Sequence, residues 1–317
     1  MPLLLLRLML FISLIVSSLY RKIYDRGMLS VKWIKSLFKS AALHDQSGFK
    51  KKRARHVSPL SSLSDDERIY ATGDIHGRCD LFERILKSID LYEHAYPIKH
   101  TTEVVLGDMI DRGSQSKEVI DLLIERALTR HLKVLRGNHE NMMIEMLKNP
   151  AFLSGWIRVG GLNTLFSYGI SPQMPESFDD DEQFQEQFSQ QLLEHIPQNH
   201  IKFLKTLELS WQHKHFIFVH AGLRPELSLL QQDDRDLTEI RDPFLNFKGQ
   251  FEGYVVHGHT PVKTVDVRNN RINVDTGAFA TGNLSCVVFE KERILRLLPY
   301  KEGVSVENLI EPLTIPQ

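Results

Sequence analysis

The stretch Gly107 to Gly113, with the sequence GDMIDRG, constrains this chain more than any other feature. The residues before it, 103–106, are mainly apolar and predict a short strand. Gly107 lets the backbone turn sharply, so the carboxylate of Asp108 follows at the carboxyl end of that strand, where open α/β sheets place their ligand sites. With a second acid three residues later and an arginine beside it, the stretch can serve a metal, a proton relay and a phosphate together.

The same pattern recurs four more times, as an apolar run followed by a residue that can bind a metal, usually after a glycine. The repeats are GDIHG at 73–77, RGNHE at 136–140, HAG at 220–222 and HGHTP at 257–261. Five strand ends therefore offer aspartate, histidine or asparagine to one edge of a sheet.

The composition is that of a globular protein with a full hydrophobic core. At 317 residues, with 42% apolar residues and a formal net charge of -1, the chain is long enough for one large domain with an insertion. The near-neutral net charge gives no sign of a basic surface for nucleic acids, so sequence-specific binding of nucleic acids is not expected. Only Cys79 and Cys286 are present, which excludes a disulfide framework and favours a reducing compartment.

Residues 1–66 are interpreted as an apolar and basic leader followed by a linker. The uninterrupted apolar part of residues 2–20 is shorter than the roughly 20 residues of a spanning helix. A marginal membrane anchor, a signal sequence without a clear cleavage site and translation that starts at Met28 all fit this segment. Residues 21–55 hold eleven Lys or Arg against two Asp, so an anchor would leave the following domain on the cytoplasmic side.

Weak membrane association through residues 1–40 is therefore one expectation, at the inner face of a membrane. Apolar residues recur at helical spacing between lysines in 31–38, as in an amphipathic helix on an anionic surface. A solvated basic leader that packs loosely on the domain is the alternative. Residues 47–66 predict a linker, and the folded, cytoplasmic domain is expected to begin near Glu67.

Strands and helices alternate after residue 67 in a way that predicts an α/β fold. The three motifs that begin at Gly73, Gly107 and Arg136 are spaced like consecutive βαβ units, which predicts two parallel crossovers. Residues 149–212 then break the alternation with a glycine-rich piece and helical stretches. We interpret them as a helical insertion beside the site, either a determinant of substrate selectivity or a cap that completes the core.

The second half of the domain is expected to be more antiparallel. Asn269-Asn270 predicts a hairpin turn between strands at 265–267 and 272–274. Further strands are expected at 286–289 and 294–298.

The strand ends supply six candidate metal ligands. They are Asp74, His76, Asp108, Asn138, His220 and His259. Oxygen and nitrogen donors without a thiolate suit manganese, iron or zinc. A carboxylate between two ligand groups can bridge two ions about 3.5–4 Å apart, and Asp108 is the natural bridge. One Gly-Asp or Gly-His pair would be ordinary turn chemistry, but five in register are hard to obtain by chance.

In this order, GDIHG, GDMIDRG, GNHE, HAG and HGHT resemble the calcineurin-like metallophosphoesterase superfamily, and most closely its bacterial serine/threonine phosphoprotein phosphatase branch. The resemblance covers roughly residues 68–290. It implies two packed mixed β-sheets flanked by helices, an α/β/β/α sandwich, with a catalytic domain at 67–300 and a C-terminal tail at 301–317. It also implies two divalent metal ions, with manganese expected and iron or zinc as alternatives.

The resemblance also implies roles for the motif residues. Asp74, His76 and Asp108 would hold the first ion, and Asp108, Asn138, His220 and His259 the second. The histidine of GHT is the family ligand, so His259 is preferred over His257. His139 would be the general acid, oriented by Asp111. Arg112 would clamp the phosphate, and Arg241 fits the second clamp better than Arg224 does.

Elementary chemistry agrees with these roles. Two cations lower the pKa of a bridging water, so that hydroxide can attack the phosphorus directly. Arg112 is planar and always charged, which suits a bidentate grip on phosphate, although an ion pair with Asp111 or Asp108 is the alternative. A histidine beside an aspartate can be kept protonated, and the departing alkoxide of a serine needs a proton.

Three functions remain open. The first is hydrolysis of phosphomonoesters, above all phosphoserine and phosphothreonine in proteins. The second is a nucleotide hydrolase that resembles the symmetrical bis(5'-nucleosyl)-tetraphosphatases, with RNA decapping as an extension. Those relatives tend to carry alanine and aspartate where this chain has Asp111 and Glu140, which favours the phosphatase. The third, a non-catalytic interaction module, ranks last because no ligand position is lost.

Overall fold

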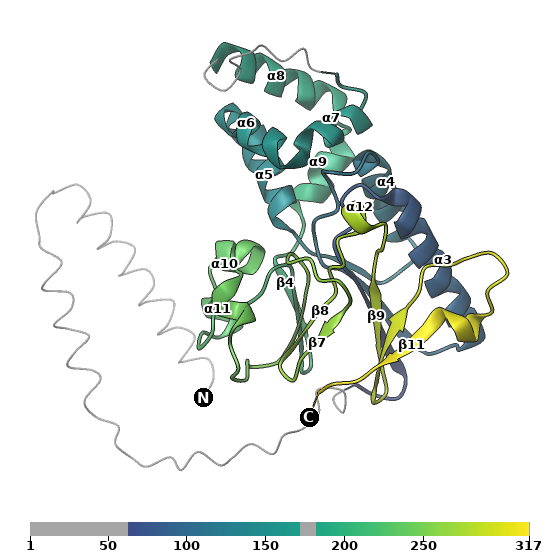
Figure 1. Cartoon of the computed structure of the whole chain (residues 1–317). Helices are drawn as coiled ribbons and strands as arrows, with labels where there is room; N and C mark the ends of the chain where they lie inside the picture. The colour runs from purple at the N-terminus through teal and green to yellow at the C-terminus, as the bar shows by residue number, and fades with distance from the viewer. Residues whose placement is uncertain (1–62, 172–181, 317) are drawn as a thin grey trace, which may run out of the picture. The chain divides into compact units, whose positions relative to one another are not determined.

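Two mixed β-sheets build the part of the chain that the computed structural model describes, residues 63–171 and 182–316 (Figure 1). The first sheet has the strand order β11-β10-β9-β1-β2-β3. Its strands are β1 (Glu67–Thr72), β2 (His100–Val105), β3 (Leu132–Val134), β9 (Cys286–Glu290), β10 (Arg293–Leu297) and β11 (Ile310–Leu313). β1, β2 and β3 run parallel, as the spacing of the motifs predicts, whereas β9 and β10 pair antiparallel.

The second sheet has the strand order β4-β5-β6-β8-β7. Its strands are β4 (Ser210–His213), β5 (Phe216–Val219), β6 (Tyr254–His257), β7 (Asp266–Val267) and β8 (Arg271–Asn273). β7 and β8 form the antiparallel hairpin that the turn signal predicts. β5, β6 and β8 are parallel, so this half is less antiparallel than expected.

The helices lie outside the two sheets and above their carboxyl ends (Figure 1). α3 (Cys79–Ala95) and α4 (Ser116–Arg126) cover the first sheet, and α10 (Asp234–Glu239) and α11 (Asp242–Leu245) cover the second. The helices that follow β3 are α5 (Asn138–Lys148), α6 (Leu153–Trp156), α7 (Leu162–Ser167), α8 (Glu182–His195) and α9 (Gln198–Lys205). A kinked stretch, Ile157–Gly161, joins α6 to α7. A short helix, α12 (Ala278–Thr281), follows β8.

The strand sequences are mostly continuous apolar runs because each sheet packs against helices on one face and against the other sheet on the other face. In β1, Ile69 and Ala71 pack into the core between the sheets, whereas Tyr70 packs against the helices. In β5, Phe218 faces the same central core and Ile217 packs on the side of α10 and α11. The expected α/β/β/α sandwich is confirmed.

Two expected boundaries differ from the structure. Residues 301–317 were expected as a tail, but β11 lies among them and pairs with β10. Pro312 cannot donate to a sheet, which is tolerated because β11 is an edge strand. The range 149–212 expected for the insertion includes the start of β4. The polar sequence SWQH of this edge strand gives no apolar run by which to predict it.

The leader predictions lie outside the described residues. Leu63 already packs in the core between the sheets, and β1 begins at Glu67. Within residues 63–171 and 182–316, no helix is both long and apolar enough to cross a membrane. Membrane association through residues 1–40 and a cytoplasmic location therefore stay predictions.

Candidate metal centre

The carboxyl ends of five parallel strands meet where the two sheets adjoin. Asp74 and His76 follow β1, Asp108 follows β2, and Asn138 follows β3. From the second sheet, His220 follows β5 and His259 follows β6. These six residues are the metal ligands that the sequence predicts. Five of them have less than a tenth of their surface exposed: Asp74, His76, Asp108, His220 and His259.

The backbone of this region is unusually strained. Of the eight non-glycine residues that adopt a positive φ in the described parts of the chain, five are His76, Asp108, Asp111, Arg112 and His259, with φ between 46° and 70°. Left-handed backbone is disfavoured for side chains with a Cβ, at a cost of about 1–3 kcal/mol each. Such strain persists only where the surrounding fold holds it, and it concentrates at functional sites.

Asp108 lies at the middle of the centre. Its Oδ1 is 3.4 Å from His220 Nε2, and its Oδ2 is 3.6 Å from His76 Nε2. It belongs to two groups whose ligand atoms lie within 4.8 Å of one another, one with His76 and His139 and one with His220 and His259. The two carboxylate oxygens therefore face different histidines, which is the geometry of a bridging ligand.

The remaining candidate ligands border these groups. Asn138 Oδ1 and His259 Nδ1 each lie 3.2 Å from His220 Nε2. Asp74 belongs to neither group, but its carboxylate accepts the backbone N–H of His259 at 3.1 and 3.2 Å. All six candidates are thus brought into one cluster.

Two of the histidines are oriented by backbone carbonyls. His76 Nδ1 donates to the carbonyl of Ile110 at 2.9 Å, and His220 Nδ1 donates to that of Leu106 at 2.8 Å. This arrangement turns the Nε2 atom of each ring toward Asp108, because an outer hydrogen bond to one ring nitrogen fixes which nitrogen is presented to a metal.

The cluster fits divalent cations. His259 Nε2 is buried without a hydrogen-bond partner among the described residues, an orphan that a metal would satisfy. Burial lowers the pKa of His76 and of His259 to about 3, so both rings are neutral at pH 7, as metal ligands must be. Burial and the neighbouring Asp275 raise the pKa of Asp74 well above its ordinary value, a cost that a nearby cation would remove.

Gly137→Ala is expected to lower the affinity for Mn²⁺ by at least about tenfold, the scale of disturbed outer contacts of metal ligands. An added Cβ at Gly137 would lie 2.1 Å from Asp108 Oδ1 and 2.5 Å from the Asp108 backbone nitrogen, so the carboxylate would have to move. The readout is bound Mn²⁺ per chain across a titration. Gly155→Ala is the matched control, because a Cβ there meets nothing within 4 Å. Equal affinities in the two variants would show that this close approach is unimportant.

A second buried pair lies beside the cluster. His139 Nδ1 donates to Asp111 Oδ2 at 2.7 Å, and the two side chains are 1% and 0% exposed. Burial would lower the pKa of His139, but the carboxylates of Asp108 and Asp111 outweigh it and raise that pKa above its ordinary value. His139 Nε2 is 3.9 Å from Asp108 Oδ2, so the ring also points its outer nitrogen toward the cluster.

Arg112 extends over the same cluster. Its Nη1 donates to His76 Nε2 at 3.0 Å, and its guanidinium lies 4.9 Å from the centre of the Phe279 ring. It forms no ion pair with any described residue, so the expected alternative of a pair with Asp111 or Asp108 is not formed. Because Arg112 has no carboxylate partner among the described residues, its positive charge is available to bind an anion.

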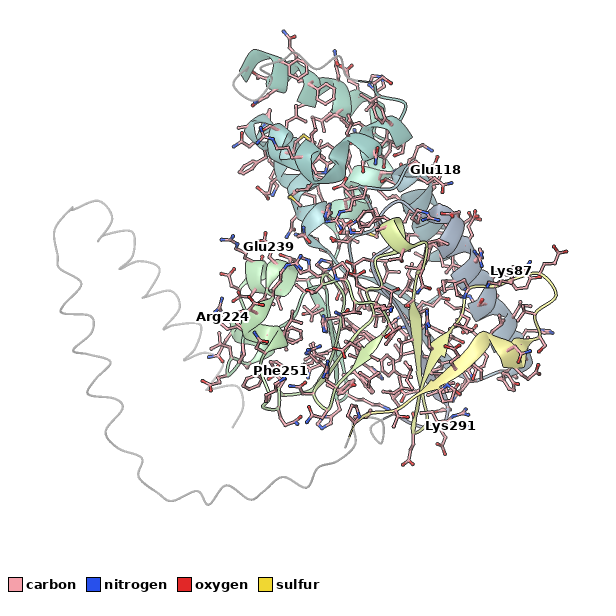
Figure 2. All side chains as sticks on the ribbon, viewed as in Figure 1. Lys87, Glu118, Arg224, Glu239, Phe251 and Lys291 are labelled. Atoms are coloured by element: carbon pink, nitrogen blue, oxygen red, sulfur yellow. The ribbon has the colours of Figure 1, made fainter. Side chains whose placement is uncertain are left out.

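The two candidates for a second arginine differ in position. Arg241 Nη1 donates to the hydroxyl of Thr260 at 3.4 Å, directly after His259 in the chain. Arg224 is half exposed, is labelled in Figure 2 at the surface near α10 and α11, and is paired with Asp236 of α10 at 2.6 Å. The position of Arg241 next to the cluster favours it over Arg224.

Two buried acids beside the cluster are not among the site residues that the sequence predicts. Glu140 Oε2 accepts from the backbone nitrogens of Asp108 (2.9 Å) and Gly137 (2.8 Å), and Oε1 from those of Met109 (2.8 Å) and Ile110 (3.3 Å). Burial and the adjacent Asp108 raise the pKa of Glu140 to about 7. Glu140 thus ties the loops after β2 and β3 together, a role that its place in the first turn of α5 could have indicated.

Asp275 is the other omission. It follows β8 and Val274, so it repeats the strand-end pattern a sixth time, but without a preceding glycine. It is 1% exposed, and its Oδ1 accepts the backbone N–H of Gly277 at 2.8 Å. Because it lies close to Asp74, it contributes to the negative charge of the cluster.

Comparison with known proteins finds one protein family and several relatives that are similar to this chain. The model of the calcineurin-like phosphoesterase family matches residues 67–298. The chain is 26% identical over 273 residues to the bis(5'-nucleosyl)-tetraphosphatase PrpE (asymmetrical) of Oceanobacillus iheyensis, covering 76% of this chain and 92% of that protein. It is also 26% identical over 228 residues to serine/threonine-protein phosphatase 1 of Salmonella typhimurium, covering 68% and 89%.

A solved structure is similar as well. The crystal structure of a putative diadenosine tetraphosphatase superposes with a TM-score of 0.51 at 19% sequence identity, covering 74% of this chain and 95% of the other. At this identity the likeness supports the fold alone.

Proposed function

Because this chain belongs to the calcineurin-like phosphoesterase family and is a hydrolase, we propose that it removes phosphate from phosphoserine and phosphothreonine in proteins. The buried pair of His139 and Asp111 is the observation that carries this proposal. A serine or threonine leaves as an alkoxide, which is a strong base and departs poorly without a proton donor. A nucleoside polyphosphate leaves as a weaker base and needs such a donor less.

We further propose that two divalent ions, manganese first and iron or zinc otherwise, occupy the cluster. Asp74, His76 and Asp108 would hold one ion, and Asp108, Asn138, His220 and His259 the other. Such a pair would lower the pKa of a bound water to near neutrality and would offset the negative charge of the phosphoryl group.

The residues of the chain then divide the remaining work. Arg112, with Arg241 as the second candidate, binds the equatorial oxygens of the phosphoryl group and stabilises their charge in the transition state. As the bond from phosphorus to the serine oxygen breaks, His139 Nε2 gives its proton to that oxygen. Asp111 holds the opposite nitrogen, so the proton is aimed outward and the imidazolium is stabilised until it leaves.

Hydrolysis of bis(5'-nucleosyl) tetraphosphates is the second candidate function. The name of the relative from Oceanobacillus iheyensis favours it, since its similarity extends over 76% of this chain. Phosphoproteins or nucleotides are therefore the partners to test.

An activity panel separates the two functions. The Mn²⁺-loaded full chain would be assayed on a phosphoserine peptide, a phosphothreonine peptide and diadenosine tetraphosphate, with the chelator-treated protein as control. We expect kcat/KM to be at least about tenfold higher on the phosphopeptides, equivalent to about 1.4 kcal/mol of transition-state stabilisation. A preference of that size for the tetraphosphate would replace the first function with the second.

A further inference from the structure

The helical insertion reaches the buried pair directly. Trp156 ends α6, and the chain kinks within the following stretch Ile157–Gly161, where Gly160 adopts a non-helical φ of 120°. The bend brings the carbonyl of Gly160 to the backbone nitrogen of Arg112 at 3.1 Å. A Cβ at Gly160 would lie 2.8 Å from the Arg112 backbone nitrogen, so only glycine allows this approach.

Two side chains of the insertion hold the carboxylate of Asp111. Trp156 Nε1 donates to Oδ2 at 2.9 Å and contacts Oδ1 at 3.2 Å. Thr164 Oγ1 donates to Oδ1 at 2.6 Å, and it accepts the backbone N–H of Asp111 at 2.9 Å. Together with His139, these donors satisfy both oxygens and prevent the carboxylate from rotating.

The donors also favour the ionised carboxylate. Burial raises the pKa of Asp111, whereas the hydrogen bonds from His139, Thr164 and Trp156 lower it and offset part of that increase. A carboxylate that accepts several hydrogen bonds is stabilised in its charged form. A carboxylate of Asp111 that is fixed in this way holds the His139 ring in one orientation.

We propose that Trp156 and Thr164 are positioning residues for proton donation by His139. They act through Asp111, so that the helical insertion is part of the catalytic apparatus and not only a cap or a determinant of selectivity. This inference rests on the proposed role of His139 as the general acid, but it does not depend on whether the substrate is a protein or a nucleotide.

A purely structural role would have a different signature. Trp156 is 1% exposed and packs in the core, and a Cβ at Gly161 would lie 2.5 Å from its ring. A core residue affects stability and all substrates alike when it is replaced. A positioning residue affects the substrates that need the proton more than those that do not.

The test compares leaving groups in the Mn²⁺-loaded full chain. Glycerol 2-phosphate releases a strongly basic alkoxide, and p-nitrophenyl phosphate releases a weak base that departs unaided. Trp156→Phe removes the N–H donor and keeps an aromatic ring. We expect kcat to fall about tenfold on glycerol 2-phosphate and less than about threefold on p-nitrophenyl phosphate, with unchanged bound metal.

Matched variants separate positioning from folding. Trp211→Phe makes the same change in β4, where Trp211 stacks on Phe218 and contacts no residue of the pair, and it should leave the ratio of the two rates unchanged. Thr164→Val should reproduce the selective loss, and Thr164→Ser should restore the ratio because it restores the hydroxyl. Equal losses on both substrates in Trp156→Phe and Thr164→Val would overturn the inference. A wild-type protein that hydrolyses glycerol 2-phosphate but no phosphopeptide would overturn the proposed protein substrate. The ratio of the rates on glycerol 2-phosphate and p-nitrophenyl phosphate in the variants would still test the role of Trp156 and Thr164.

Discussion

Asp108→Asn is expected to reduce hydrolysis by at least about a thousandfold, which corresponds to about 4 kcal/mol. The two oxygens of Asp108 face histidines on opposite sides of the cluster, so one substitution disturbs both halves. The number of bound Mn²⁺ ions should fall to one per chain or none. Turnover and metal content measured on the same preparation check this expectation.

Peripheral ligands provide the comparison for Asp108. His76→Asn and Asn138→Asp should be less damaging, because each changes one side of the cluster. Asp80→Asn is the matched control, since Asp80 is exposed and paired with Arg78 on the surface. An Asp108→Asn protein with two tightly bound ions and near-normal turnover would refute the bridging assignment.

His139→Asn should lower activity on a phosphoserine peptide by about 10²–10⁴-fold, the usual contribution of a positioned acid. The loss on p-nitrophenyl phosphate should be far smaller, because p-nitrophenolate leaves without a proton. Bound metal should be nearly unchanged. Asp111→Asn should give a weaker form of the same selectivity, since it keeps the ring of His139 but loses the charge that orients it.

This experiment also decides between two readings of His139. Its Nε2 lies near Asp108, and it groups with His76 and Asp108 as a potential metal ligand. If His139 is a ligand, His139→Asn should lose metal and lose activity equally on both substrates. His131→Asn is the control, because His131 is exposed and its side chain hydrogen-bonds to Thr102, away from the cluster. The metal content and the ratio of the two rates therefore distinguish the acid from the ligand.

The local elements were largely predictable. Strand, glycine and ligand follow one another within a few residues, so the pattern around Asp74, Asp108 and Asn138 is visible without any tertiary contact. The two parallel crossovers follow from the spacing of those motifs, and β7 and β8 follow from the turn at Asn269-Asn270. Such features depend on backbone turns and on short-range periodicity, which the chain carries locally.

Edge strands and supporting contacts were not predictable in the same way. β11 lacks a clear alternation and contains Pro312, so only its pairing with β10 identifies it as a strand. Glu140 in the first turn of α5 and Asp275 after β8 have local signals, but their contacts with backbone nitrogens and with neighbouring carboxylates arise only in the folded chain. Burial and neighbouring charge belong to the fold and not to the residue.

The sequence by itself determined the order of the strand-end motifs, the α/β class and the set of groups that can bind metal. Only the tertiary structure decided which oxygen of Asp108 faces which histidine, and which side chains hold Asp111. Trp156 lies 45 residues from Asp111 in the chain, and His220 lies 114 residues from the carbonyl that orients it. Contacts over such separations arise when packed sheets and helices bring distant segments together, and no local pattern specifies the hydrogen bonds that form there.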